Sequence, residues 1–333
     1  MSQLSIAVAM CTCNGSRYLR EQLQSIARQT TAADELVVCD DASTDQTADM
    51  IEKFAADAPM RVRLVRNPVA LGCTRNFEQA IRLCSGQILV LADQDDIWKP
   101  NKLFAIARAF ADQPGAEYVF SDADIVDEGG AGLEFSLWET VGFEPRHFVP
   151  SSQVAMLLKR NLVTGAAMAF RACLRGIALP IPPAWSHDYW LALLGSILSF
   201  GVPIPQRLFL YRRHLAQQLG CGKDTLLQRI RISMASAPDY HAKAARIAEL
   251  RERVAAWART ANCPLDHLRL VAEKELHLSR RALIRSARGS ARIAPLLREA
   301  ASGRYQRFSF SWGSMIRDLM ATTSNYDPPA TAR

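Results

Sequence analysis

The chain has 333 residues, 49% of them hydrophobic and 22% charged, which is the composition of a globular protein long enough to bury a full core and excludes a disordered chain. Its net charge of +7 is uneven, because the residues from Gly222 onward hold 20 Lys+Arg against 10 Asp+Glu, whereas residues 1–221 hold 20 against 23. The basic tail indicates an anionic partner, but the absence of zinc-ligand spacings, RNP-like aromatic motifs and helix-turn-helix signatures argues against nucleic acid.

The first 120 residues alternate predicted strands with predicted helices. Apolar runs predict strands, and apolar residues three or four positions apart predict helices. The predicted strands are Ser5–Thr12, Glu35–Cys39, Val62–Arg66, Gln87–Ala92 and Tyr118–Ser121, and the predicted helices are Tyr18–Arg28, Asp45–Ala56, Thr74–Leu83 and Lys102–Ala111. The pattern Ser43-x-x-Gln46 predicts a capping box at the start of the second helix. This alternation predicts a mainly parallel sheet with helices on both faces.

Polar side chains follow three of the predicted strands. Thr12-Cys13-Asn14 ends the first strand, Asp40-Asp41 ends the second, and Asp93-Gln94-Asp95-Asp96 follows the fourth. Ligands of such sheets bind in the crevice outside the carboxyl ends of the strands. We therefore expect these three clusters to converge on one crevice.

The acidic tetrad at 93–96 is the strongest local signal. Three carboxylates in four positions repel one another, and a solvated acidic turn is the simplest interpretation. Its place in the predicted crevice favours a divalent cation instead, held by Asp93 and Asp95 and sharing its coordination shell with substrate phosphates. Asp41 could accept a hydrogen bond from a nucleobase or a ribose. The lack of GxGxxG and GxxxxGK[ST] motifs weighs against a dinucleotide cofactor and a P-loop NTPase.

The segment Tyr189–Gln206 contains 18 uncharged residues and has to be weighed as a membrane span. Glycines and prolines at 195, 201, 203 and 205 leave its helical part too short to cross a bilayer. It predicts a buried helix followed by a strand. A further strand, Leu208–Tyr211, precedes Arg212 and His214, two cations that could clamp a diphosphate; a solvated turn is the simpler interpretation of Arg213.

Over roughly residues 5–221 the sequence resembles the family 2 glycosyltransferases. Several motifs in the family's order carry the resemblance. They are Thr12-Cys13-Asn14-Gly15, Asp40-Asp41-Ala42-Ser43-Thr44-Asp45, Asn67 with Leu71-Gly72 and Asn76-Phe77, Asp93-Gln94-Asp95-Asp96-Ile97-Trp98, Asn161-Leu162-Val163-Thr164-Gly165, His187-Asp188-Tyr189-Trp190 and Tyr211-Arg212-Arg213-His214. The acidic motif and the last three are especially similar to a subgroup often labelled rhamnosyltransferases.

The resemblance implies an α/β fold of GT-A type, a mainly parallel sheet flanked by helices, here with a C-terminal helical extension. It also implies a nucleotide-diphosphate sugar donor, a divalent metal (Mn²⁺ or Mg²⁺) and inversion at the anomeric carbon. Residues 1–120 would then form the nucleotide-sugar-binding half and 121–221 the acceptor-binding half of one domain. Residues 222–333 would form the basic helical extension.

The same resemblance implies a role for each site residue. Asp188 falls at the catalytic base, Asp93 and Asp95 form the metal-binding pair, and Asp41 holds the nucleoside. The other residues implied to contact the nucleotide sugar are Cys11, Thr12, Cys13, Asn14, Asn76, Asp93, Gln94, Trp190, Arg212 and His214. For Trp190 the alternative is core packing. Two positions depart from the family: Cys13 replaces a common aromatic residue, and His187 replaces an acidic residue that often precedes the base.

The basic tail contains two predicted helices, Ala242–Thr260 and Leu265–Ala287, with Arg and Lys between apolar positions. They either pack on the body with basic outer faces or attach peripherally to anionic lipid. Thr322–Arg333 is expected to be disordered. The eight cysteines include no CxxC pair and favour a reducing cytosol, and the N-terminus has no secretory leader. We expect a cytoplasmic protein, peripheral at the inner face of the cell membrane if the tail binds lipid.

The sequence therefore predicts an inverting, metal-dependent glycosyltransferase that adds a single sugar, with rhamnose as one candidate, to a surface-polysaccharide or lipid-linked acceptor. The lack of a QxxRW motif argues against a processive synthase. Two alternatives stay open. A sugar-nucleotide pyrophosphorylase should carry a Gly-rich basic loop soon after the first strand, and a non-catalytic nucleotide-sugar or polyanion-binding protein would bind a donor without turning it over.

Overall fold

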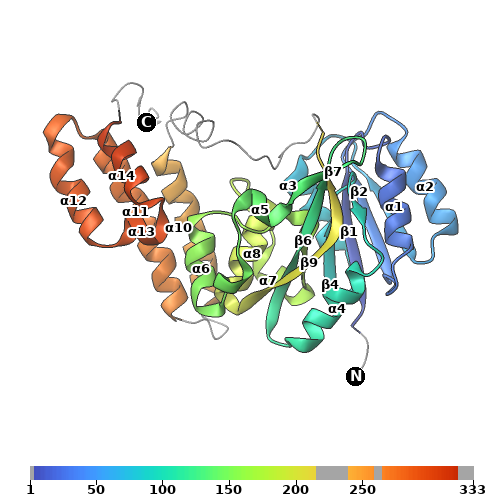
Figure 1. Cartoon of the computed structure of the whole chain (residues 1–333). Coiled ribbons are helices and arrows are strands. Elements are labelled where there is room, and N and C mark those ends of the chain that lie inside the picture. Colours follow the sequence, from blue (N-terminus) through green and yellow to red (C-terminus); the bar gives the residue numbers. More distant parts are fainter. Residues whose placement is uncertain (1–3, 215–238, 259–264, 322–333) are drawn as a thin grey trace. The chain divides into compact units, whose positions relative to one another are not determined.

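A computed structural model describes residues 4–214, 239–258 and 265–321 of the chain. The described residues divide into two compact units. The first comprises residues 4–153 and 161–214, and the second comprises 154–160, 239–258 and 265–321. Figure 1 shows that the first unit contains the sheet, whereas the second is built of helices.

The strands of the first unit form one sheet. Their bounds are β1 Ile6–Thr12, β2 Glu35–Asp40, β3 Arg61–Arg66, β4 Ile88–Ala92, β5 Ile97–Trp98, β6 Ala116–Val126, β7 Gly132–Ser136, β8 Met168–Arg171 and β9 Phe200–Arg212. The order is β3-β2-β1-β4-β8-β6-β9-β5, with β7 paired to β6. The pairs among β1 to β4 and the β6–β9 pair are parallel, while β5, β7 and β8 pair antiparallel. The predicted α/β class with a mainly parallel sheet is confirmed.

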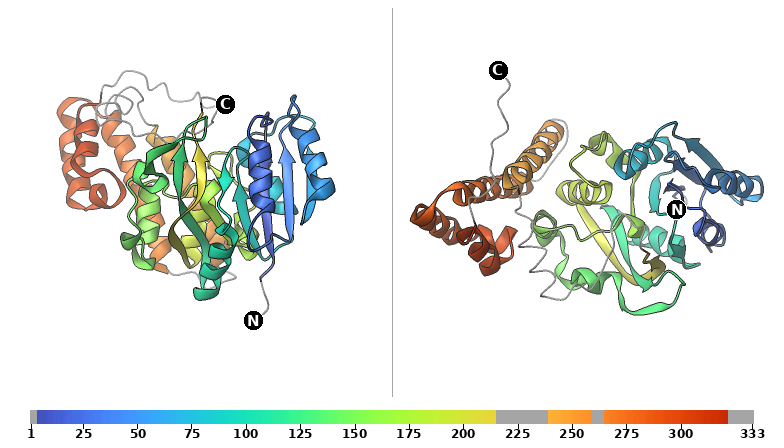
Figure 2. Two further views of the ribbon diagram at one scale, coloured as in Figure 1. Left: turned by 45° about the vertical axis from the view of Figure 1, so that its right-hand side comes forward. Right: turned by 90° about the horizontal axis from the view of Figure 1, so that it is seen from above.

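The central strands are apolar on both faces because helices cover both faces. β1, β2 and β4 are buried along almost their whole length, as expected for parallel strands in an α/β sheet. The helices are α1 Leu19–Ala27, α2 Thr47–Asp57, α3 Cys73–Leu83, α4 Lys102–Asp112, α5 Leu137–Val141, α6 Pro150–Lys159, α7 Arg175–Ala178 and α8 His187–Leu198. α1 contacts α2, and α3 contacts α8. Figure 2 shows α1 and α2 on one side of the sheet and α3 on the other, as right-handed crossovers require.

Two local predictions differ from the structure. The capping box at Ser43 and Gln46 is wrong, since α2 begins at Thr47 and Gln46 caps it with no side-chain bond. Ser43 instead donates its hydroxyl to Asp40 Oδ1 at 2.6 Å. The strand predicted at 208–211 is the end of the much longer β9, which runs through two prolines. The register between β6 and β9 shifts next to them, and prolines are tolerated at such irregularities.

The uncharged segment from Tyr189 folds as predicted, with α8 followed directly by β9. α8 is buried on nearly all sides, which explains its lack of a polar face. Among the described helices, none combines the length and the hydropathy that a bilayer span requires.

The second unit is a helical cluster. Its helices are α10 Tyr240–Ala258, α11 Leu265–Ser286, α12 Ile293–Ala301, α13 Arg304–Phe308 and α14 Ser311–Leu319, joined by the end of α6. α11 packs along α10 and also contacts α12, α13 and α14 (Figure 2). The predicted helical extension is confirmed, although its three short helices were not predicted. Residues 322–333, predicted to be disordered, lie outside the described residues.

Candidate active site

The three polar clusters lie at neighbouring strand ends. Thr12 pairs with Asp40 in the register of β1 and β2, and its hydroxyl donates to Asp40 Oδ1 at 2.7 Å. β1 and β4 are also paired, so the tetrad that follows Ala92 emerges beside Cys13. The Cys13 backbone N–H donates to Gln94 Oε1 at 2.8 Å, and Gln94 Nε2 donates back to the Cys13 carbonyl at 3.1 Å. The first and third clusters are therefore in direct contact.

Asp93 lies near two other carboxylates, whose repulsion Lys102 offsets only in part. Burial and then the carboxylates of Asp95 and Asp188 raise its pKa to about 7, with Lys102 acting in the opposite direction. Within the described part of the chain, no hydrogen bond reaches its carboxylate, whereas Gln22 Nε2 donates to its backbone carbonyl at 2.9 Å. A group that ionises poorly in the free protein, with like charges beside it, is typical of a binding or catalytic site.

Cys73, the first residue of α3, shows that the acidic residues of different strands share one region. Desolvation, followed by the charges of Asp93, Asp188 and Asp41, raises the pKa of its thiol to about 12. The thiol of Cys11 is raised well above its usual range by burial and by charges that include Asp93 and Asp41. Asp93 and Asp41 thus act on both thiols, Asp188 acts on Cys73, and Asp95 acts on Asp93.

The carboxylate of Asp41 accepts hydrogen bonds from the loop that follows β3. Its Oδ1 accepts hydrogen bonds from the Leu71 backbone N–H at 2.7 Å and from Asn67 Nδ2 at 3.0 Å, and its Oδ2 accepts from the Gly72 N–H at 2.9 Å. Asn76 is buried behind it, donating to the Cys39 carbonyl at 2.7 Å and accepting from Asn67. Asn76 is buried and supports the loop through these bonds.

Asp188 lies in the first turn of α8 and is half-buried. Its Oδ2 accepts a hydrogen bond from the Gly165 backbone N–H at 3.2 Å. A Cβ at position 165 would lie only 2.7 Å from His187 Nε2, so the backbone at Gly165 closely approaches the segment that carries Asp188. His187 stacks on Phe77 with ring centroids 4.0 Å apart, and neither of its buried ring nitrogens has a hydrogen-bond partner in the described residues.

The two cations after β9 contact the acidic tetrad. His214 Nε2 lies 2.8 Å from Asp95 Oδ2. Arg212 is buried, and its guanidinium donates to the carbonyls of Asp95 and Glu128, both at 3.1 Å, and pairs with Glu21. All three guanidinium nitrogens therefore have partners inside the protein.

Trp190 is buried, whereas Asn14 is exposed. Trp190 is 0% exposed, and its indole N–H donates to the Ala178 carbonyl at 2.8 Å. The core-packing alternative describes it, so its implied sugar contact is corrected. The Asn14 side chain accepts from the Thr44 backbone N–H at 2.9 Å and joins the first cluster to the loop after β2.

Sequence reasoning missed Lys102, the first residue of α4. It is fully buried, its Nζ donates to the Ala166 carbonyl at 2.7 Å, and it lies over the rings of Trp98 and Phe209 at 4.1 and 4.2 Å. Burial lowers its pKa to about 7, against the opposing effect of Asp96 and Asp93. A lysine at a helix start, where acidic residues are usual, was the available signal.

A divalent cation such as Mg²⁺ or Mn²⁺ binds through oxygen ligands supplied by the protein, the substrate and water. The described residues contain no group of three or more His, Cys, Asp and Glu side chains that could hold a metal by themselves. The half-buried carboxylates of Asp93 and Asp95 are nevertheless hard oxygen donors, and a cation would relieve the repulsion that raises the pKa of Asp93. These residues fit an ion that takes its remaining ligands from substrate phosphates and water.

Comparisons with known proteins identify the family. Residues 7–171, about half of the chain, match the model described as glycosyl transferase family 2. An uncharacterised protein of Mycobacterium tuberculosis is 27% identical over 214 residues, covering 63% of this chain and 59% of that protein, so the match spans about three fifths of this relative's length. The dTDP-rhamnosyl transferase RfbG of Shigella flexneri is 24% identical over 226 residues, covering 64% of this chain and 74% of the relative.

Among solved structures, residues 1–349 of TarS from S. aureus, crystallised with UDP-GlcNAc, match with a TM-score of 0.59 at 14% identity, covering 95% of this chain and 89% of that one. This likeness shows the fold, which is of GT-A type as the sequence predicted. The chain therefore belongs to glycosyl transferase family 2.

Proposed function

We propose that this family 2 glycosyltransferase is an inverting, metal-dependent enzyme that moves a single sugar from a nucleotide-diphosphate donor to a surface-glycan or lipid-linked acceptor. The observation that carries the proposal is the grouping of Asp93, Asp188 and Asp41 around Cys73. It brings together the implied base, the implied nucleoside residue and one member of the implied metal pair from three separate segments of the chain, and the other member, Asp95, acts electrostatically on Asp93.

Asp188 is the proposed general base. An acceptor hydroxyl is a poor nucleophile near neutral pH, and a carboxylate within hydrogen-bond reach can take its proton as the new glycosidic bond forms. The nucleoside diphosphate leaves from the opposite face of the anomeric carbon, so one base suffices for inversion. The hydrogen bond from the Gly165 N–H fixes Oδ2, and α8 fixes the backbone of Asp188.

Asp93 and Asp95 are the proposed ligands of Mn²⁺ or Mg²⁺. Such an ion would neutralise charge on the departing diphosphate as a Lewis acid. The protein's own part is to hold the two carboxylates in place. Arg212 and Gln22 bind the backbone carbonyls of Asp95 and Asp93, and His214 binds the side chain of Asp95. We assign these three residues to positioning the acidic pair.

The donor is proposed to be a dTDP-sugar, with rhamnose as the first candidate. The similarity to RfbG of Shigella flexneri supports this choice, as does the resemblance of the acidic motif to rhamnosyltransferases. We assign residues 1–120 to donor binding and 121–221 to acceptor binding. We also propose a cytoplasmic enzyme whose basic C-terminal extension contacts the anionic membrane that carries lipid-linked acceptors.

The test compares donor turnover by the wild type and by Asp188→Asn, with dTDP-rhamnose as the first donor and Mn²⁺ present. We expect the variant to bind the donor normally and to lose transfer by a factor on the order of 10²–10⁴. Asp57→Asn, at an exposed carboxylate at the end of α2, is the matched control. Donor binding without turnover by the wild type would favour a non-catalytic binding protein, and unchanged turnover by Asp188→Asn would remove Asp188 as the base.

A further inference from the structure

The last helix of the second unit exposes its apolar side. Trp312, Ile316, Leu319 and Met320 are 71%, 53%, 46% and 71% exposed. They follow the spacing i, i+4, i+7 and i+8, so they share one face of α14 and of the residue that ends it. We call this face the α14 stripe. Exposed aromatic and aliphatic residues grouped in this way mark an interaction surface.

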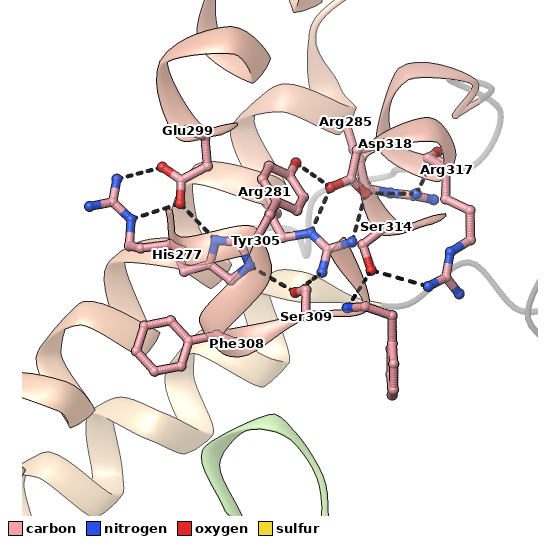
Figure 3. Close-up of polar contacts among 12 residues, drawn as sticks. His277, Arg281, Arg285, Glu299, Tyr305, Phe308, Ser309, Ser314, Arg317 and Asp318 are labelled. Atoms are coloured by element: carbon pink, nitrogen blue, oxygen red, sulfur yellow. Dashed lines mark hydrogen bonds and ion pairs between the residues drawn. The ribbon is translucent and has the colours of Figure 1, made fainter. Parts of the chain in front are cut away.

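The buried side of the same helix is largely polar. Ser314, Met315 and Asp318 face the interior, which reverses the usual arrangement of an amphipathic helix. Asp318 is 0% exposed and accepts hydrogen bonds from Arg281 Nε at 2.6 Å, from Arg281 Nη2 at 3.1 Å and from the Tyr305 hydroxyl at 2.7 Å. Figure 3 shows these groups converging between α11, α13 and α14.

This polar interior fixes which side of α14 is exposed. Rotating the helix to bury the stripe would pull Asp318 away from Arg281 and leave a buried guanidinium without its partner, which is strongly unfavourable. Ser314 reinforces the arrangement, because its hydroxyl accepts a hydrogen bond from the Phe310 backbone N–H at 3.0 Å. The exposure of the stripe is therefore imposed by the fold of the unit.

The charges around the stripe are positive. Residues 265–321 hold eleven Lys+Arg against five Asp+Glu. Four of the five acids are paired within the unit: Glu273 with Arg307, Glu275 with Arg251, Glu299 with Arg304 and His277, and Asp318 with Arg281. The arginines at 280, 288 and 298 are exposed. The outward charge of this part of the unit is thus basic.

A further apolar pair belongs to α12. Ile293 and Leu297 are 48% and 58% exposed and lie one helical turn apart. α12 contacts α14, and Arg298 follows Leu297 directly. Apolar residues that include a tryptophan, accompanied by exposed arginines, are the composition of helices that lie in a membrane interface. A second copy of the chain is a poorer partner for this surface, because its own exposed arginines would repel the arginines of the first copy.

We propose that the α14 stripe inserts into the interfacial layer of an anionic lipid bilayer, with the exposed arginines contacting lipid phosphates. This inference specifies the membrane contact of the proposed function: the anchor is the apolar face of α14, and the basic residues of the tail assist it. Its test measures lipid binding alone and does not depend on transfer activity, so it can fail while the proposed reaction stands, and the reverse.

The experiment is vesicle flotation with the purified full-length chain. The probes are phosphatidylcholine vesicles with and without phosphatidylglycerol, at low and high salt. The test variant is Trp312→Ser combined with Ile316→Ser. The matched control, Phe104→Ser combined with Val149→Ser, removes two exposed apolar side chains from the first unit. Circular dichroism and the midpoint of thermal unfolding establish that each variant is folded.

We expect the wild type and the control to float with the anionic vesicles, and the test variant to bind at least about tenfold more weakly. Subtracting the emission spectrum of Trp312→Phe from that of the wild type gives the emission of Trp312, and its maximum should shift to the blue when vesicles are added. Three results would overturn the proposal. The first is that the wild type does not float with anionic vesicles. The second is that the test variant floats as well as the wild type and high salt abolishes the flotation of both. The third is that the wild type, but not the test variant, forms a dimer in light scattering and binds no lipid.

Discussion

The acidic motif at 93–96 in the first unit and Asp318 in the second unit have opposite surroundings. In the first unit, none of the described residues donates a hydrogen bond to the side chain of Asp93 or to Oδ2 of the buried Asp96. In the second unit, the fully buried Asp318 is satisfied by Arg281, Arg285 and Tyr305. A buried charge without a partner is costly, and the second arrangement avoids that cost. The acidic motif of the first unit therefore retains charge that a ligand could neutralise, whereas the charge of Asp318 stabilises the fold of the second unit.

Replacing the unneutralised carboxylate should separate activity from stability. Asp93→Asn removes a proposed metal ligand and should lower transfer by a factor on the order of 10²–10³, as loss of one group that stabilises developing charge does. The same change removes repulsion with Asp95 and Asp188, so the midpoint of thermal unfolding should rise. Activity assays with Mn²⁺ and calorimetry of the metal-free protein measure the two effects.

Asp57→Asn controls for the loss of one negative charge at an exposed position of the same unit. It should leave activity and the unfolding midpoint unchanged. If Asp93→Asn retained wild-type activity, or were less stable than the wild type without metal, the contrast between the two units would be wrong.

The opposite outcome is expected in the second unit. Asp318→Asn leaves the Arg281 guanidinium buried without its counter-charge and should reduce the free energy of unfolding of this unit by about 3–5 kcal/mol. Hydrogen exchange resolves the effect by region: protection should fall in α11 and α14 and stay unchanged in β1 and β4.

The double variant Arg281→Met with Asp318→Leu provides the control, because it removes both charges at once. It should recover most of the lost protection, since replacing both partners of a buried pair by apolar groups is often close to neutral. Equal losses in the single and double variants would mean that the pair acts through its shape alone.

A smaller effect is expected where backbone approach, and not charge, positions the proposed base. Gly165→Ala would bring a methyl group within 2.7 Å of His187 Nε2, and His187 is packed on Phe77 and has little room to move. We expect transfer to fall about tenfold through displacement of Asp188, with little change in donor affinity. Adding His187→Ala makes room for the methyl group. Wild-type kcat in Gly165→Ala would show that this contact does not position the base.

The parts that the sequence predicted are those that depend on one short segment. The apolar runs of β1, β2 and β4 define buried strands without reference to distant residues, and the polar clusters at their ends follow from parallel order. The helix α8 was predicted for the same reason. The capping box at Ser43 failed because a closer partner, Asp40, competes for its hydroxyl.

The parts that the sequence did not predict depend on partners far along the chain. Arg212 binds the carbonyl of Asp95 across 117 positions, a contact to the backbone of the acidic motif that the sequence did not predict. Asp318 and Arg281 are 37 positions apart, and only their pairing reveals that α14 exposes its apolar side. No local pattern contains such information.

Lys274, a buried cation of the second unit with no acidic partner among the described residues, gives the smallest test. Lys274 donates to the Phe308 carbonyl at 3.0 Å, and burial, then the nearby charges of Arg281 and Lys243, lower its pKa to about 7. Because the unfolded chain binds this proton more tightly than the folded one, stability should rise with pH above 7.

Lys274→Met lacks this linkage, so its stability relative to the wild type should drop by about 1 kcal/mol between pH 7 and pH 8. Urea unfolding at the two pH values measures the change, and Lys53→Met, at an exposed position, should show none. A gap between Lys274→Met and the wild type that is independent of pH would mean that Lys274 stays charged in the folded protein, and the second unit would then contain an uncompensated charge of the kind assigned here to the first.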